Sequence, residues 1–315
     1  MGAAATPRAG QGGTGNTVAG APASAGNGAM SMATPAAGSG GTAAGASGAT
    51  SAAGASAAGA SVPTIAVEDL VNDGPYPSTT VMNSGPGNGY TIYQPGELAP
   101  GGVKTPVIAW ISGGGSMPYG YTLLPHLATH GFMVIASNTV PNVGQQAALG
   151  EEMVAAIDWV SAEAERTDSS LFGKIDTTKV AAMGYSMGAL AATSAGTDPR
   201  WTTTVHISGG AGDGTIKNLH APAIFVCGAS GVDIAGANCA TDFEQATAPV
   251  FYGVFEGGEH LGIRTPPYQE RIQTVVTGWL RWQLLGDEPL KTMFVGDPCT
   301  VCKDSNWSVQ QKNLQ

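Results

Sequence analysis

The stretch at residues 180–188, VAAMGYSMG, decides the fold of this chain. A short apolar run, typical of a buried strand, leads into a Gly-x-Ser-x-Gly pentapeptide, and the small residues after it predict a helix through Ala195. At a sharp turn from strand to helix, Gly184 and Gly188 leave room for neighbouring backbone, so the hydroxyl of Ser186 can stand exposed above the sheet. We interpret Ser186 as a nucleophile, with a tight structural turn as the plainer alternative.

Outward from this turn, strand-like and helix-like patterns alternate along the chain. The expected strands are residues 89–93, 106–111, 132–136, 180–183, 203–207, 223–227 and 250–256, and the other expected helices are 121–130, 146–166 and 268–285. Several of these strands are continuous apolar runs, as in strands that are buried on both faces. The alternation predicts an α/β fold with a mostly parallel central sheet and helices on both faces.

A serine hydroxyl attacks efficiently only when a base takes its proton, so a histidine is expected to accompany Ser186. With a nucleophile on such a turn, the order along the chain is serine, acid, histidine, which leaves His206, His220 and His260. His206 lies inside an expected strand, and His220 precedes another. His260 lies in a loop after the last expected strand, at the carboxyl edge of the sheet where ligands gather, and it is the predicted base.

The imidazole of this base needs a carboxylate that holds its tautomer and stabilises the imidazolium. Two candidates, Asp233 and Asp242, follow the expected strand at 223–227. Asp233 lies nearer the end of the strand and is the preferred acid, while Asp242 stays open as the alternative.

Acyl transfer also needs hydrogen-bond donors aimed at the developing oxyanion. One expected donor is the N–H of Met187, and the other comes from Gly113 or Gly114 in the Gly-rich loop after the strand at 106–111. A phosphate-binding role for this loop is disfavoured, because it has neither a Walker lysine nor a G-x-G-x-x-G spacing. The side chains expected to line the substrate pocket, unless they belong to the core, are Tyr185, Met117 and Tyr119.

Several stretches carry a family resemblance: GPY at 74–76, GYTIY at 89–93, LATHGF at 127–132, KIDTTKVAAMGYSMG at 174–188 and GGEH at 257–260. On these residues the chain, from about 74 to 286, resembles the bacterial cutinase and polyester hydrolase family, the α/β-hydrolases that include the poly(ethylene terephthalate) hydrolases. The resemblance implies an α/β-hydrolase fold and a triad of Ser186, Asp233 and His260. It also implies Met187 as one oxyanion donor and places Gly113 at the position of the other.

The chain differs from this family at three positions. Gly113 stands where the family usually has an aromatic residue, and the tryptophan that lines the family's acyl cleft falls near Gly210. Aligning Ile234 and Ala235 on the family's Ile-Ala after the acid puts Val232 at the position of the acid. Asp233 therefore fits only with a shift of one residue.

The cysteines number four, which suits two disulfides in a domain that is expected to be exported. Of the three possible connectivities we favour Cys227 with Cys239, which closes the loop carrying Asp233, and Cys299 with Cys302. The second pair forms a Cys-x-x-Cys that could instead be a redox motif or half of a zinc site. Its position in the tail after the last expected helix favours a structural role.

Another pair of residues has a spacing that a metal could use. His126 and His130 lie one turn apart on the expected helix at 121–130. Because no glutamate lies between them and no third ligand is nearby, we interpret them as surface and helix-end histidines. We expect neither a metal nor another cofactor.

Charge and composition limit the partners. The chain has 13 Lys and Arg and 23 Asp and Glu, a net charge of −10, and no basic run, which argues against nucleic acid and anionic membranes. No apolar run reaches the roughly 18 residues of a transmembrane helix. Residues 1–61 hold one charge, Arg8, and no aromatic residue, which predicts a disordered Ala/Gly/Ser-rich tether. Residues 62–315 are then the expected hydrolase domain with a Cys-containing tail.

These patterns predict a serine esterase of the cutinase or polyesterase type, which hydrolyses carboxylic esters or polyesters through an acyl-enzyme. We expect a monomer that is secreted or tethered to the cell envelope, with no signal peptide in this sequence. Two alternatives use the same fold. One is a non-catalytic scaffold that binds a ligand, and the other is an acyltransferase that uses the same triad with an acceptor other than water.

Overall fold

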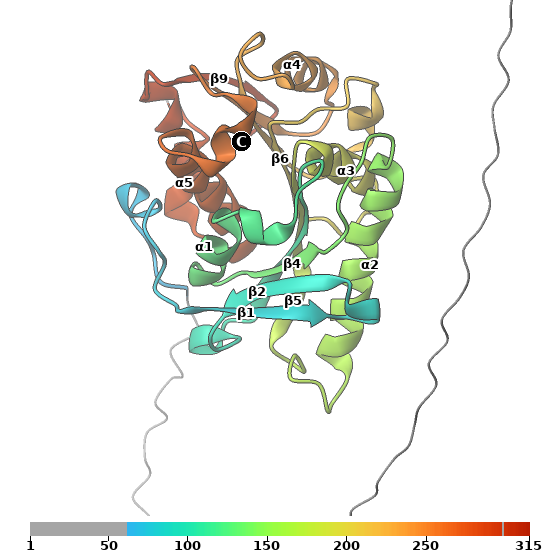
Figure 1. The fold of residues 1–315 in the computed structure, drawn as a ribbon. Helices are drawn as coiled ribbons and strands as arrows, with labels where there is room; N and C mark the ends of the chain where they lie inside the picture. Colours follow the sequence, from blue (N-terminus) through green and yellow to red (C-terminus); the bar gives the residue numbers. More distant parts are fainter. Residues whose placement is uncertain (1–61, 298) are drawn as a thin grey trace, which may run out of the picture. The chain divides into compact units, whose positions relative to one another are not determined.

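The computed structural model describes residues 62–297 and 299–315, and the tether predicted for residues 1–61 lies outside them. The described residues form a mixed sheet flanked by helices (Figure 1). The strands are β1 (Ser78–Ser84), β2 (Tyr90–Pro95), β3 (Thr105–Ile111), β4 (Met133–Ser137), β5 (Ile175–Tyr185), β6 (Thr203–Ile207), β7 (Ala223–Gly228), β8 (Val250–Phe255) and β9 (Trp307–Lys312). The α-helices are α1 (Leu123–Thr129), α2 (Gln146–Glu165), α3 (Met187–Ala195), α4 (Gly236–Gln245) and α5 (Tyr268–Leu280).

In the described residues, the sheet has nine strands in the order β1-β2-β4-β3-β5-β6-β7-β8-β9. The six strands from β4 to β8 in this order run parallel, and β1, β2 and β9 are antiparallel additions at the two edges. Consecutive parallel strands are joined by crossovers, which return the chain to the end of the sheet where the strands begin. The carboxyl ends of β5, β7 and β8 therefore lie at the same end of the sheet, and the loops that follow them can meet there.

Helices cover both faces of the sheet (Figure 1). Alternate side chains of a strand point to opposite faces of the sheet. In β3, Ile108 and Trp110 belong to the core between the sheet and α1 and α5. Val107 and Ala109 belong to the core between the sheet and α2 and α3. A third cluster packs α4 against β7 and β8. Burial on both faces explains why these strands are continuous apolar runs in the sequence.

The predicted α/β class with a mostly parallel sheet is confirmed, but β1, β9 and α4 were not predicted. The residues of β1 are almost all exposed, and four of the six residues of β9 are polar, so neither edge strand produces an apolar run. Helix α4 begins with a glycine and keeps few side chains buried, which weakens its helical pattern. Strand β5 also starts earlier than predicted, because Ile175 pairs with Thr105 ahead of an irregularity in the ladder.

Both predicted disulfides are confirmed. Cys227, in β7, is joined to Cys239, in α4, and Cys299 is joined to Cys302 ahead of β9. In the chain-entropy account, closing a loop of the first kind stabilises a fold by about 3 kcal/mol. The first bond also ties α4 to the strand whose end leads into the loop with Asp233.

Of the two histidines predicted at the surface and at a helix end, His130 does follow the last residue of α1, but the surface position was wrong, because both side chains are buried. The segment before β1 covers this side of α1: His130 Nε2 lies 3.1 Å from the carbonyl oxygen of Asn72, and His126 Nδ1 lies 3.7 Å from Asp73. Burial lowers the pKa of His130 to about 3 and that of the equally buried His206, in β6, to about 4.

These buried histidines make the fold sensitive to acid. A histidine with a lowered folded-state pKa stays neutral in the fold while the unfolded chain takes up a proton below about pH 6.5, so stability falls as the pH falls. We expect His130 and His206 each to remove about 1.4 kcal/mol of unfolding free energy per pH unit below pH 6.5, until the pH nears their folded-state pKa. Urea unfolding at pH 7.0, 6.0 and 5.0 measures this loss.

The variant His206→Gln should lose less unfolding free energy between pH 7 and pH 5 than the wild type does. The exposed His220 provides the matched control, because His220→Gln should keep the wild-type pH dependence. An unfolding free energy that stays constant or rises from pH 7 to pH 5 would contradict this expectation.

Candidate active site

Ser186 lies on a strained turn between β5 and α3. Its backbone has a φ of 53° and a ψ of −115°, in a region that residues with a side chain rarely adopt. A Cβ on Gly184 would lie 2.1 Å from the carbonyl oxygen of Gly188, and a Cβ on Gly188 would lie 1.9 Å from that of Ile111. Both glycines are therefore required for the turn to pack against its neighbours, as the pentapeptide indicates.

The structure brings Ser186, Asp233 and His260 together. His260 Nε2 lies 2.9 Å from Ser186 Oγ, and His260 Nδ1 lies 2.7 Å from Asp233 Oδ1. Because a carboxylate can only accept, Nδ1 carries the proton, and Nε2 is left to accept the proton of the serine hydroxyl. The three side chains come from the ends of β5, β7 and β8, which the parallel sheet places at one edge.

Asp233 is held as a buried anion. Its side chain is fully buried, and its second oxygen accepts from the Gly228 N–H at 3.0 Å while Oδ1 also accepts from the Ala235 N–H at 2.9 Å. Burial raises the pKa of Asp233, but the hydrogen bonds from His260 and the two backbone groups outweigh it, so the pKa lies below its ordinary value. The carboxylate is therefore ionised at neutral pH, as a partner of an imidazolium must be.

Asp242, the alternative acid, serves another purpose. Its two oxygens accept from the backbone N–H groups of Ala211 at 2.7 Å and Gly212 at 2.8 Å, and it makes no contact with His260. Burial raises its pKa despite these two hydrogen bonds. Asp242 thus fixes the loop after β6 onto α4 and stands apart from the serine.

The two glycines proposed as oxyanion donors differ in their contacts. The Gly113 N–H donates to the hydroxyl of Tyr121 at 2.9 Å, so this donor is already engaged. Gly114 is exposed and faces Met187, because a Cβ on it would lie 3.3 Å from Met187 Cγ. Within the described residues, the N–H groups of Gly114 and Met187 have no hydrogen-bond partner. They are the pair of donors left for an oxyanion.

With this geometry established, the chain can be compared with known proteins. The model of a protein family described as PETase, PET hydrolase-like, matches residues 54–311. The chain belongs to the PET hydrolase-like family. No curated protein matches the sequence. Membership of this family supports an ester hydrolase, and the sheet has the α/β-hydrolase fold that the resemblance implied.

The structure gives physical reasons for two departures from the pattern of PET hydrolase-like proteins. A Cβ on Gly113 would lie 2.6 Å from the ring of Tyr185, so no side chain fits at position 113. At position 210, a Cβ would lie 2.7 Å from the backbone of Asn238, so α4 occupies the space that an aromatic side chain at Gly210 would need. The cleft of this PET hydrolase-like chain therefore lacks both aromatic side chains.

The third departure concerns the acid. Val232, which a direct alignment on the PET hydrolase-like pattern would place at the acid, is 45% exposed, whereas Asp233 turns inward to His260. The backbone in this loop is tightly confined. A Cβ on Gly228 would lie 1.8 Å from the carbonyl oxygen of Gly258, so the loop with the acid and the loop with the histidine touch at this glycine.

The side chains predicted to line the substrate pocket of this PET hydrolase-like chain lie in three different settings. Tyr185 is buried, its hydroxyl donates to the His260 carbonyl oxygen at 2.5 Å, and its ring lies 5.3 Å from the imidazole. It therefore supports the histidine loop. Met117 is half-buried, and Tyr119 is 76% exposed on the rim of the Gly-rich loop.

A shallow hollow of about 620 Å³ lies beside His260. It is bounded by Val232, Ile234, Glu259 and Leu261, and its aliphatic side chains are unusually exposed, with Ile234 at 83% and Leu261 at 69%. These side chains form an apolar surface beside the hydrogen-bonded pair of Ser186 and His260.

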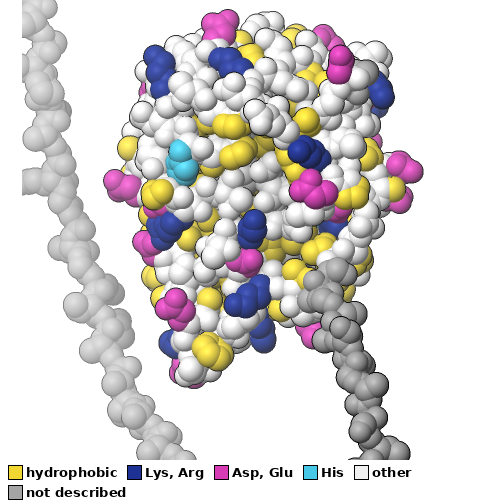
Figure 2. All heavy atoms as spheres, turned by 180° about the vertical axis from the view of Figure 1, so that it is seen from behind, with side chains coloured by type: hydrophobic (Ala, Val, Ile, Leu, Met, Phe, Trp, Pro, Cys, Tyr) yellow, Lys and Arg dark blue, Asp and Glu magenta, His cyan; other side chains and the backbone are white. Residues whose placement is uncertain are grey.

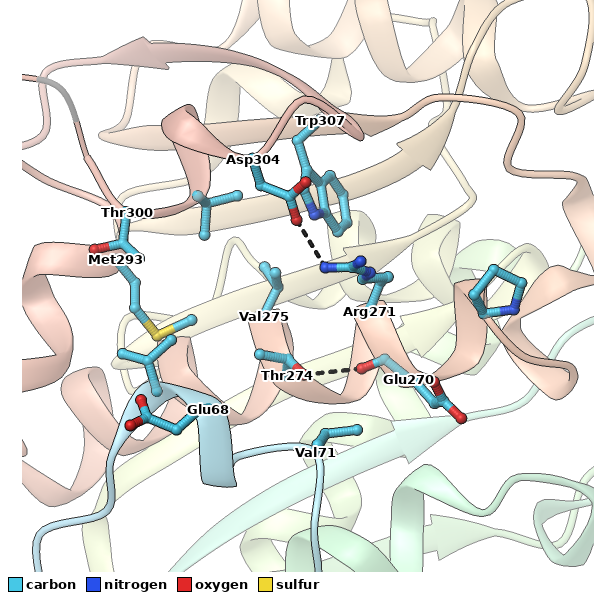
Figure 3. A pocket seen from close by; sticks show the side chains of 13 residues that line it. Glu68, Val71, Glu270, Arg271, Thr274, Val275, Met293, Thr300, Asp304 and Trp307 are labelled. Carbon is cyan, nitrogen blue, oxygen red and sulfur yellow. Dashed lines mark hydrogen bonds and ion pairs between the residues drawn. The ribbon is translucent and has the colours of Figure 1, made fainter.

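A second pocket, of about 380 Å³, lies between α5, the turn at Val67–Asp69 and the tail before β9 (Figure 3). Figure 3 shows the ion pair of Arg271 with Asp304 across this pocket, at 2.7 Å. None of the residues of the Ser186 site lines it. We find nothing there that joins it to the chemistry of the serine.

Neither a metal centre nor a membrane segment is found in the part of the chain that the structure describes. There, no group of three or more His, Cys, Asp and Glu side chains is placed to hold a metal ion, the His126 and His130 pair included. Helices long and apolar enough to cross a membrane are also lacking in these residues.

Sequence reasoning missed two residues of the site, Tyr121 and Arg264. Tyr121 caps the Gly113 N–H, and the Arg264 guanidinium lies 4.7 Å from the Tyr121 ring and donates to Ser116 Oγ at 2.7 Å. No motif marks either residue. Only the folding of the Gly-rich loop against the histidine loop brings them together.

Proposed function

We propose that this protein is a serine esterase that hydrolyses carboxylic esters through an acyl-enzyme at Ser186. The observation that carries the proposal is the continuous hydrogen-bonded chain from Ser186 Oγ through His260 to Asp233, with separations of 2.9 and 2.7 Å. Membership of the PET hydrolase-like family supports the same class of reaction. Burial alone favours a neutral carboxyl group, so the hydrogen bonds to Asp233, the one from His260 included, are what keep it ionised.

In the proposed reaction, Ser186 Oγ bonds to the ester carbonyl carbon as its proton passes to His260 Nε2. The carbonyl oxygen becomes an oxyanion, which accepts from the N–H groups of Met187 and Gly114. Asp233 stabilises the imidazolium. The C–O bond to the alcohol then breaks, His260 returns the proton to the leaving alcohol, and an acyl-enzyme remains.

Water completes the cycle. His260 Nε2 takes a proton from the water as the water oxygen bonds to the acyl carbon and a second oxyanion forms. The bond from the acyl carbon to Ser186 Oγ then breaks, His260 gives its proton to Oγ, and the carboxylic acid leaves. One ester and one water thus give one acid and one alcohol. No cofactor is needed for any step.

We propose aliphatic esters and polyesters as the substrates. The rim beside His260 exposes Val232, Ile234 and Leu261, while the positions of two aromatic side chains in the family's pattern are taken by Gly113 and Gly210. Charged groups are sparse as well, since residues 62–315 hold 36 − 1 = 35 of them among 315 − 61 = 254 residues, and Figure 2 shows wide uncharged surface between them on one face. A neutral polymer surface can approach such a protein without desolvating many charges.

A panel of esters tests the proposal. The wild type should hydrolyse p-nitrophenyl butyrate and release acid from a film of poly(butylene adipate) faster than from a film of poly(ethylene terephthalate), as measured by liquid chromatography of the soluble products. Failure to hydrolyse any ester above the uncatalysed rate would refute the esterase. Faster release from the aromatic film would refute the aliphatic preference alone.

We propose that the protein works outside the cytoplasm. Disulfides persist in oxidising compartments, and the fold contains the pairs Cys227–Cys239 and Cys299–Cys302. An apolar polymer is also too large to enter a cell. The extracellular location is consistent with the family.

A further inference from the structure

Arg264 differs from every other arginine in the part of the chain that the structure describes. The others each pair with a carboxylate at 2.7 Å, namely Arg166 with Asp168, Arg200 with Asp198, Arg271 with Asp304 (Figure 3) and Arg281 with Asp287. The contacts of Arg264 are with neutral groups: it donates from one nitrogen to Ser116 Oγ and lies over the ring of Tyr121. It is exposed. In a chain with a net charge of −10, this guanidinium has no anionic partner among the described residues.

The unpaired guanidinium lies between the two loops that flank the serine. Arg264 ends the short helical turn that begins with His260, and it reaches across to the Gly-rich loop. A Cβ on Gly120 would lie 3.5 Å from Arg264 Nη2, an ordinary contact distance, so the guanidinium packs against the backbone of the Gly-rich loop. It therefore spans the gap from the loop of the base to the loop of the oxyanion donors.

Two hydrogen bonds connect Arg264 to the expected oxyanion site. Nη2 of Arg264 donates to Ser116 Oγ at 2.7 Å, and Ser116 Oγ lies 3.5 Å from the carbonyl oxygen of Gly114, a glycine on which a Cβ would lie 3.3 Å from Met187 Cγ. The remaining N–H donors of the guanidinium have no hydrogen-bond partner among the described residues. Planar and permanently charged, these donors match the two oxygens of a carboxylate.

We propose that Arg264 binds the free carboxylate of acid-ended esters, an inference that rests on the proposed esterase function. Half-esters of dicarboxylic acids and acid-ended oligoesters are then preferred substrates. Cleavage of a polyester at one bond leaves chains of this kind, with a carboxylate at one end and further ester bonds along the chain. Glu259, on the hollow beside His260, repels an anion there. The carboxylate is therefore bound on the side of the Gly-rich loop.

Two matched pairs of substrates test the proposal. Monoethyl adipate is compared with ethyl hexanoate, which places the charge on the acyl side, and the butyrate ester of 6-hydroxyhexanoate is compared with hexyl butyrate, which places it on the alcohol side. For each pair, chromatography of the products gives the ratio of kcat/KM for the anionic ester to that for the neutral ester.

In at least one pair, Arg264→Gln should lower this ratio about tenfold, mainly by raising KM for the anionic ester, because a charge-assisted hydrogen bond is lost. Arg264→Lys should restore part of the ratio, since it keeps the charge and loses the planar fork. Raising NaCl from about 0.05 M to about 0.5 M should lower the ratio for the wild type and leave it nearly constant for Arg264→Gln.

Arg166→Gln is the matched control, because it removes the same charge from a paired arginine after α2, at the opposite edge of the sheet. It should keep the wild-type ratio. A ratio unchanged in both pairs for Arg264→Gln, or an equal loss on neutral and anionic esters, would overturn the proposal and leave Arg264 as a tie between two loops.

The same assays distinguish a failure of the Arg264 proposal from a failure of the proposed esterase function. Hydrolysis of ethyl hexanoate that requires Ser186 supports the esterase whatever the ratio for Arg264→Gln. A wild type that hydrolyses neither member of either pair would overturn the proposed function, and the proposal for Arg264 with it.

Discussion

We expect Ser186→Ala to lower kcat for p-nitrophenyl butyrate by about 10⁵-fold, with little change in KM. The reason is geometric, because Ser186 Oγ lies 2.9 Å from His260 Nε2. A strained backbone conformation at Ser186 holds the hydroxyl in this position. The residual activity would come from the oxyanion donors acting on bound substrate. Steady-state kinetics with both purified proteins measures the loss.

Alanine at position 186 keeps the turn and removes only the hydroxyl, so the variant should unfold at nearly the wild-type temperature. Ser170→Ala is a suitable control, because it removes an exposed hydroxyl between α2 and β5, away from His260 and the Gly-rich loop. A loss of less than tenfold in Ser186→Ala would mean that another group attacks the ester.

The second large effect is expected at the acid. Asp233→Asn should lower kcat by about 10⁴-fold, because an amide can donate to His260 Nδ1 and so favour the tautomer that no longer accepts the serine proton. Asp242→Asn should lower kcat by less than about tenfold, since Asp242 holds the backbone of Ala211 and Gly212 and does not contact the imidazole.

These two aspartates form a matched pair for the assay. Both are buried, both lie after β7, and the same substitution is made in each. A larger loss of kcat in Asp242→Asn than in Asp233→Asn would contradict the assignment of Asp233, the hydrogen-bond partner of His260, as the acid.

Much of the fold could be predicted because its parallel strands are apolar on both faces. The segments at 106–111, 132–136 and 223–227 were recognisable for that reason, and β3, β4 and β7 lie there. Edge strands carry no such signal, because one side of β9 faces solvent and its sequence, WSVQQK, is mostly polar. The burial of His130 depends on a segment far away in sequence, which no local pattern reveals.

For the site, sequence reasoning went as far as the residues that motif and chain order identify. Ser186 is marked by its glycines, and His260 and Asp233 by their places after strands. It named Gly113 or Gly114 as the second oxyanion donor, and the family resemblance pointed to Gly113. It could not reveal that the hydroxyl of Tyr121 accepts from the Gly113 N–H. Arg264 was missed entirely, since its lack of a carboxylate partner is a property of the folded protein.

The central claim is that His260 activates Ser186 as a nucleophile, and covalent labelling tests it most directly. The wild type is treated with a fluorophosphonate, digested and analysed by mass spectrometry. We predict a single adduct, on the peptide containing Ser186, formed at least about 100-fold more slowly in His260→Ala because the general base is missing. No adduct at Ser186, or equally fast labelling without His260, would contradict the account.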